Sequence, residues 1–165
     1  MNNFLRMTSL VATVAGLALS TPALAATESS NATVNIVSPL TLTNDTGLNF
    51  GTIVGPFAGE VVRVDISGNR NCGGLTCSGT TVSAANFTLT GTPDQGVTLT
   101  IPDSVTLNGP GAATLDVDMT NDKPADPTLD SSGSATFGVG GQLTIPNGTV
   151  DGVYSNTFDV TAEYL

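Results

Sequence analysis

Residues 154–164 read YSNTFDVTAEY, and this stretch decides the fold class. From Phe158 to Tyr164 an apolar side chain stands at every second position, with a polar one between each pair. A period of two is typical of a β-strand that buries one face. The stretch therefore predicts a terminal strand whose inward-facing residues are Tyr154, Phe158, Val160, Ala162 and Tyr164.

The same alternation recurs through the rest of the chain, and no helical period follows the N-terminal segment. Turns rich in glycine, proline and asparagine separate the stretches, and Gly138–Gly141 predicts a bulge or bend. Many short strands joined in this way predict an all-β chain folded as an immunoglobulin-like antiparallel β-sandwich. The inward-facing residues expected elsewhere include Val62, Val64, Ile66, Phe87, Leu89, Leu115, Val117, Met119, Phe137, Val139, Leu143 and Ile145.

The N-terminus predicts a signal peptide over residues 1–25. Arg6 precedes an apolar run at 10–19 that is too short to span a bilayer, and Ala23-Leu24-Ala25 is a small-x-small cleavage site. The alternative is a retained membrane anchor. We expect export through the periplasm to the cell surface or medium, with residues 26–165 forming a single β-sandwich domain that has no stable membrane insertion after cleavage.

Composition excludes several function classes. The formal net charge is −10, and the cations beyond residue 25 are Arg63, Arg70 and Lys123, so we expect no nucleic-acid partner. The chain has no histidine, which removes the commonest general base and metal ligand. We therefore expect neither an enzyme nor a cofactor.

Cys72 and Cys77 are the only cysteines. An even count in an exported chain favours a disulfide. Gly73 and Gly74 can supply the positive φ of a tight hairpin tip, so we expect a local staple worth about 2 kcal/mol.

Acidic residues alternate at Asp116, Asp118 and Asp122, and further carboxylates continue to Asp130. The spacing resembles a calcium loop but lacks its turn glycine and closing glutamate. Two interpretations stay open, a weak calcium site and the solvent face of a strand. The proline-containing segment 121–133 predicts a surface loop.

Alternating strands are expected near both termini. Ala32, Val34 and Ile36 share one face of a predicted first strand, and the chain ends inside its last strand. A free strand together with an exposed sheet edge is the arrangement used in donor-strand complementation. The alternative is that residues 32–37 form the first strand of a self-complete sandwich.

Several segments resemble a bacterial exported family, domain of unknown function 4402. They are ATVNIVSPLTL at 32–42, LNFGTI at 48–53, FTLTGTP at 87–93, VTLTIP at 97–102 and DGVYSNTFDVT at 151–161. The resemblance covers essentially all of the chain after residue 25.

LNFGT and the Gly-x-Tyr-Ser-x-Thr ending are also similar to spore-coat-U-type and archaic chaperone–usher pilin domains. That resemblance implies an incomplete sandwich, with Ala32, Val34 and Ile36 as donor residues and the final strand as the acceptor edge. It also implies that Tyr164 faces a periplasmic chaperone. Unlike those domains, this chain has no cysteine at 38–43.

The function expected from these patterns is a pilin-like structural or adhesive surface subunit whose partners are copies of itself or related subunits. The alternative is a self-complete secreted sandwich that binds a glycan or a protein through loops such as 121–133.

Overall fold

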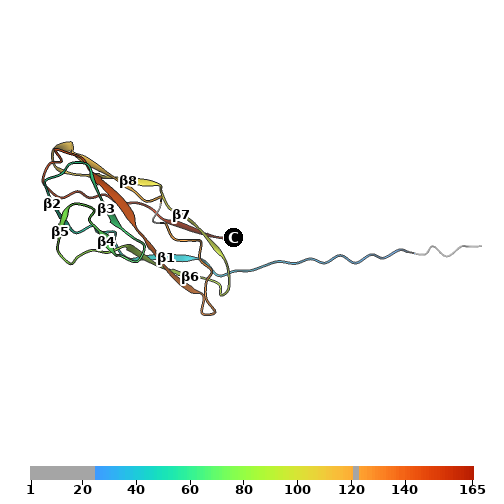
Figure 1. The fold of residues 1–165 in the computed structure, drawn as a ribbon. Coiled ribbons are helices and arrows are strands. Elements are labelled where there is room, and N and C mark those ends of the chain that lie inside the picture. The colour runs from blue at the N-terminus through green and yellow to red at the C-terminus, as the bar shows by residue number, and fades with distance from the viewer. Residues whose placement is uncertain (1–24, 121–122) are drawn as a thin grey trace, which may run out of the picture. The chain divides into compact units, whose positions relative to one another are not determined.

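The computed structural model of the protein describes residues 25–120 and 123–165 (Figure 1). This part of the chain holds twelve β-strands, a short 3-10 turn η1 (Pro110–Ala112) and no α-helix, so the all-β prediction is confirmed. The predicted signal peptide at 1–25 falls outside the described residues except for Ala25. The strands are β1 (Thr41–Thr46), β2 (Thr52–Val54), β3 (Glu60–Val64), β4 (Arg70–Asn71), β5 (Thr76–Ser78), β6 (Ala85–Thr90), β7 (Val97–Thr100), β8 (Ser104–Asn108), β9 (Thr114–Asp118), β10 (Ser134–Val139), β11 (Gly141–Ile145) and β12 (Thr161–Tyr164).

All twelve strands belong to one compact unit, residues 36–165. Its strands pair antiparallel in a three-stranded sheet, β1-β6-β10, and a five-stranded sheet, β4-β3-β11-β9-β8. Two further pairs, β12-β7 and β2-β5, complete a β-sandwich.

The core lies between the inner faces of these sheets. Phe87 of β6 stacks on Phe137 of β10 with ring centroids 5.3 Å apart, and Val62 and Val117 are fully buried in the five-stranded sheet. The inward-facing residues that the alternation predicts within β3, β6, β9, β10 and β11 are buried, whereas Ile66, predicted to continue the stripe of Val62 and Val64, lies beyond β3 and is 44% exposed. Period-two patterning therefore identified the buried face of each central strand correctly.

The chain crosses from one sheet to the other between β10 and β11. A Cβ atom on Gly138 or Gly140 would collide with the carbonyl oxygens of Ile66 and Val64 respectively. The backbones approach so closely that only glycine fits at these two positions. The predicted bend at Gly138–Gly141 is therefore confirmed.

The predicted first strand at 32–37 is wrong for this structure. Residues 25–40 form no strand, and the first strand is β1, from Thr41 to Thr46. Alternation favours an extended segment, but a strand also needs a hydrogen-bonded neighbour, and the structure gives this segment none.

The described part of the predicted surface loop, residues 123–133, forms no strand and is exposed or half-buried apart from Leu129 and Gly133, as expected, but it is also tied to the sandwich. Thr128 forms a bridge with Gly96, and Leu129 is buried in the core. The Leu99 N–H donates to the Asp126 carboxylate, and the Val97 N–H donates to the Pro127 carbonyl. Residues 126–129 therefore cover one edge of β7, and β12 covers the other.

Candidate functional site

One side of the sandwich is less well covered than the rest. The predicted inward-facing residues of the terminal stretch alternate as expected, but each is only half-buried, whereas those of the central strands are buried. Val105 and Leu107 of β8 are also half-buried. These half-buried side chains mark a place where the core is open. The five of the terminal stretch are Tyr154, Phe158, Val160, Ala162 and Tyr164.

The predicted terminal strand is shorter than its sequence pattern. Ladder pairing with β7 covers only Thr161–Tyr164, although burial alternates from Phe158 onward. β12 has β7 as its only sheet partner in the described structure. Because successive residues of an antiparallel strand point their N–H and C=O groups to opposite sides, β12 presents an open edge.

A groove with a volume of about 730 Å³ is lined by four of these half-buried residues, namely Val105, Leu107, Tyr154 and Phe158, and by no residue of β12. One wall is the segment Leu48–Ile53 and the other is Thr149–Phe158. We call these the first wall and the second wall. The floor consists of core side chains from β8, β9 and β11, namely Val105, Leu107, Leu115, Val117, Leu143 and Ile145.

The first wall is fixed by backbone pairing. Asn49 exchanges two hydrogen bonds with Ser83, at 2.9 and 3.1 Å, and Thr52 and Ile53 pair with β5. Phe50 is buried, and Gly51 adopts a φ of +74° that favours glycine. Apolar side chains of this wall therefore reach the core while its backbone borders the groove.

The second wall is held against β8 by few contacts. Ser155 exchanges two hydrogen bonds of 3.0 Å with Asn108, and the Asn156 amide donates to the Thr106 carbonyl at 2.7 Å. The Tyr154 hydroxyl donates to the Val150 carbonyl at 2.8 Å. Val150 and Val153, on the rim, are exposed.

Tyr164 ties down the start of the compact unit. Its hydroxyl donates to the Ser38 carbonyl at 2.9 Å and accepts from the Thr92 N–H at 2.7 Å. The Ser38 N–H in turn donates to the Thr92 hydroxyl at 2.6 Å. These three bonds fix the point where the N-terminal segment joins the sandwich.

The candidate donor residues lie outside every strand. Ala32, Val34 and Ile36 are exposed, and the exposed fractions are 82% for Val34 and 85% for Ile36. Whether another molecule takes up these side chains stays a prediction.

The sequence model of the domain of unknown function 4402 matches residues 40–164. The chain belongs to this family. The match confirms the first resemblance and spans the whole groove, whereas Ala32, Val34 and Ile36 precede it. Neither a comparison with curated proteins nor one with solved structures finds a match, and the likeness to pilin domains stays a prediction.

The disulfide of this family member joins Cys72 to Cys77, as predicted. Gly73 between them has a φ of +58°. The expected hairpin is wrong, however, because β4 pairs with β3 and β5 pairs with β2. The bond therefore links β5 to the residue that directly follows β4, a strand of a different sheet.

The acidic residues act as turn and strand acceptors. Asp116 accepts the Thr106 hydroxyl, and Asp118 accepts both the hydroxyl and the N–H of Thr120. The Thr120 hydrogen bonds lower the pKa of Asp118 below its ordinary value, with Lys123 adding a smaller effect. Asp122 lies outside the described residues, and among those described no group of three or more acidic or sulfur ligands is placed to hold a metal ion.

Two parts of this site were missed by sequence reasoning. LNFGTI carries part of the family resemblance, but its sequence does not show that the fold brings it to the same groove as residues 149–156 and 158. Arg70 was read only as one of few cations, although it donates to the Phe50 carbonyl at 2.9 Å. An arginine in a chain with only four lysine and arginine residues is the available signal.

Within residues 25–120 and 123–165, no helix combines the length and apolar character needed to cross a bilayer.

Proposed function

We propose that this protein is a structural subunit of a bacterial surface polymer, and that the groove of one copy takes up the N-terminal segment of another. The observation that carries the proposal is the open core, where floor and wall residues such as Leu107 and Phe158 stay half-buried at the groove. A groove with an apolar floor favours an added strand, because the strand brings apolar side chains to the floor and main-chain groups that can pair with an open strand edge.

The occupant that fits is segment 32–37 of a second copy. Its apolar residues Val34 and Ile36 alternate and are almost fully exposed, so they gain from any apolar contact. The twelve residues 26–37 would reach about 40 Å when extended, which is long enough for a strand. Only Glu28 carries a charged side chain in this stretch.

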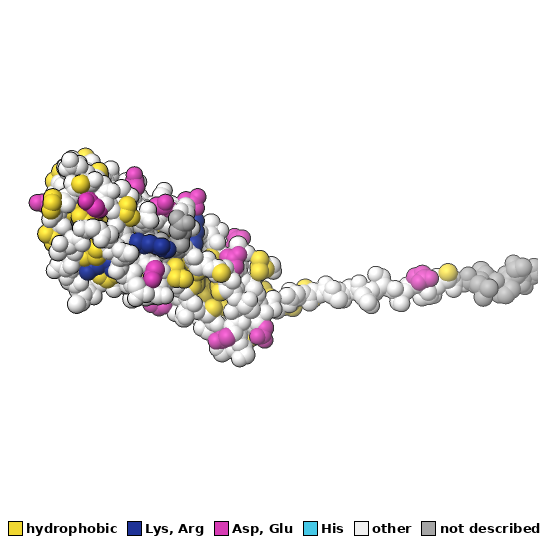
Figure 2. All heavy atoms as spheres, viewed as in Figure 1, with side chains coloured by type: hydrophobic (Ala, Val, Ile, Leu, Met, Phe, Trp, Pro, Cys, Tyr) yellow, Lys and Arg dark blue, Asp and Glu magenta, His cyan; other side chains and the backbone are white. Residues whose placement is uncertain are grey.

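Charge supports a mode of assembly that depends on apolar contact. The chain has a formal net charge of −10, and Figure 2 shows acidic side chains spread over the visible face. Copies of such a protein repel one another at long range, and salt screens that repulsion. An almost uncharged donor segment entering an apolar groove adds little to the repulsion.

The proposal implies two kinds of partner and no catalysis. Copies of the chain or related subunits would supply the donor strand at the cell surface. A periplasmic chaperone would cover the same groove during export, which the intramolecular disulfide and the predicted signal peptide favour. The second function, glycan or protein binding by a self-complete domain, becomes an outcome of the test.

The test mixes two variants that each lack one half of the contact. Deleting residues 26–37 should give a copy that accepts a strand but donates none. Leu107→Asp, which places a charge on the groove floor, should give a copy that donates but does not accept.

Each variant alone should stay monomeric in analytical ultracentrifugation, and an equimolar mixture should form heterodimers. Denaturant unfolding of each variant verifies that its sandwich is intact. Continued assembly of the deletion variant at the wild-type concentration, or a wild-type chain that is monomeric at every concentration, would refute the proposal. The second result would favour the self-complete domain.

A further inference from the structure

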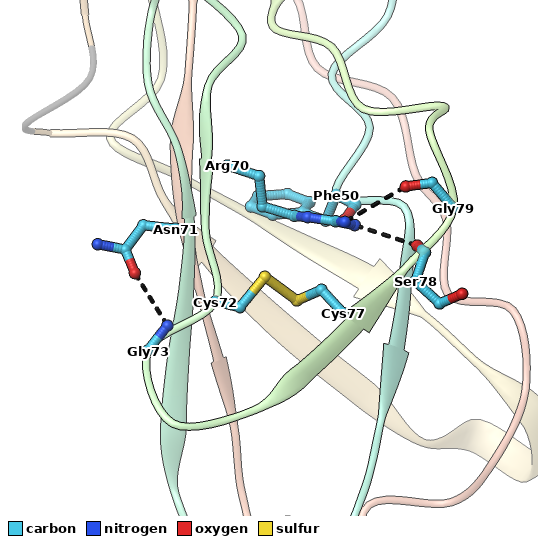
Figure 3. Close-up of a disulfide and its surroundings, with 8 residues drawn as sticks. All are labelled: Phe50, Arg70, Asn71, Cys72, Gly73, Cys77, Ser78 and Gly79. Carbon is cyan, nitrogen blue, oxygen red and sulfur yellow. Dashed lines mark hydrogen bonds between the residues drawn. A yellow bond between two sulfur atoms is a disulfide. The ribbon is translucent and has the colours of Figure 1, made fainter.

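The disulfide lies at the junction between the first wall and the body of the sandwich (Figure 3). Cys72 directly follows β4, which pairs with β3 at the edge of the five-stranded sheet. Cys77 lies in β5, directly opposite Ile53 of the first wall. The bond thus connects β5, the strand that pairs with the wall, covalently to the residue that follows β4 of the large sheet.

Asn49, near the start of the first wall, is held by its two hydrogen bonds with Ser83, but the β2 end of the wall has little lateral support apart from the disulfide. β2 has only three residues, and in the described part of the chain β5 is its only sheet partner. An isolated two-stranded sheet is marginal in water. Something else must therefore hold β2 and β5 in place against the open side of the core.

Arg70, the first residue of β4, supplies that support. One terminal nitrogen, Nη1, donates to the Phe50 carbonyl at 2.9 Å and to the Ser78 carbonyl at 3.3 Å. The other, Nη2, donates to the Gly79 carbonyl at 3.3 Å. Figure 3 shows the guanidinium group of Arg70 pointing toward Ser78 and Gly79, at the end of β5, beside the disulfide.

Arg70 and the first wall are also fitted to each other sterically. A Cβ atom on Gly51 would collide with Nη1 of Arg70 and come within 3.1 Å of Val82. The guanidinium group therefore occupies space left by the missing side chain of Gly51. Ionised donors to carbonyl groups form strong, directional bonds, and the planar fork of arginine fixes several acceptors at once.

We propose that Arg70 and the Cys72–Cys77 disulfide are positioning residues for the first wall, and that they keep the groove open for a strand. Without them, Phe50 and Ile53 move into the open groove, because apolar side chains bordering a wet apolar space gain by closing it. The groove then accepts a strand well only in the oxidised protein. The identity of the strand that enters the groove rests on the proposed function, whereas the support of the first wall by Arg70 and the disulfide does not.

The experiment measures amide hydrogen exchange and peptide binding on the purified exported chain. The variants are Arg70→Gln, Arg70→Lys and the double variant Cys72→Ser/Cys77→Ser. The matched control is Lys123→Gln, which removes one positive charge and an ion pair with Asp103 away from the groove. The probe is a synthetic peptide of residues 26–37.

In both Arg70 variants and the cysteine variant, exchange at residues 49–54 should rise at least tenfold, while exchange in β6 stays unchanged. The dissociation constant of the peptide should rise at least tenfold in the same variants. Arg70→Lys should resemble Arg70→Gln, because one ammonium group does not reproduce the fork, and Lys123→Gln should match the wild type.

Unchanged exchange at residues 49–54 overturns the positioning role, and so does raised exchange with unchanged peptide affinity. If the cysteine variant also loses protection in β6, it has unfolded, and the Arg70 variants decide. A wild-type protein that does not bind the peptide refutes the proposed function, and the exchange rates alone then decide the support of the wall.

Discussion

Replacing Val34 and Ile36 together by serine tests whether segment 32–37 enters the groove of another copy or completes the sandwich of its own chain. Both side chains are almost fully exposed in the single chain, at 82% and 85%. Their loss should therefore change the free energy of unfolding by less than about 0.5 kcal/mol. The same double variant should strongly weaken assembly if these side chains enter the groove of another copy.

The size of the effect follows from the area that the two side chains would bury. Full burial of a valine or an isoleucine contributes about 1.5–3 kcal/mol, so losing both costs about 3–6 kcal/mol of association free energy. Since about 1.4 kcal/mol corresponds to a tenfold change in affinity, the concentration for half-assembly should rise about 10²- to 10⁴-fold.

Sedimentation velocity over a wide concentration range measures assembly, and urea denaturation measures the stability of the domain. The matched control is Thr33→Ser/Asn35→Ser, which changes the opposite face of the same segment and should stay within about threefold of the wild type. Assembly of the Val34/Ile36 variant at the wild-type concentration would show that these side chains do not enter a groove. A drop of several kcal/mol in its unfolding free energy would show that the segment already completes its own sandwich.

Three further predictions concern the stability of the sandwich. Tyr164→Phe should lower the unfolding free energy by about 1–3 kcal/mol and raise amide exchange at Thr92, whose N–H loses its acceptor; unchanged exchange there would contradict the bond. Gly140→Ala should lower the unfolding free energy by about 1–3 kcal/mol in urea denaturation, because its Cβ would collide with the Val64 carbonyl, and equal stability would contradict that close approach. The hydrogen bond from the Ser132 hydroxyl is the largest effect that holds the pKa of Asp130 below its ordinary value of 3.8, and hydrogen bonds from backbone N–H groups add to it. Its stabilising effect is therefore present above about pH 4 and lost as the pH falls further, and Asp130→Asn should weaken the acid dependence of unfolding between pH 4 and pH 2.

The sequence predicted much of the fold because side-chain alternation is local. Whether Val62, Phe87 or Val117 faces the core depends on the two faces of its own strand, and the structure buries all three. The bend at Gly138–Gly141 was also predictable, because glycines inside a strand pattern mark a bulge or close backbone approach. The open side of the core was only partly predictable, through the terminal stretch that ends at Tyr164.

The terminal stretch and the cysteine pair show where the sequence reaches its limit. By itself the sequence determined that residues 154–164 present one apolar face and that Cys72 and Cys77 are near enough to bond. Only the tertiary structure decided that β12 has a single partner, that residues 48–53 face residues 149–158 across a groove, and that the disulfide joins two sheets. The physical reason is that sidedness follows from backbone geometry within one strand, whereas strand partners are chosen by contacts between residues far apart in the chain.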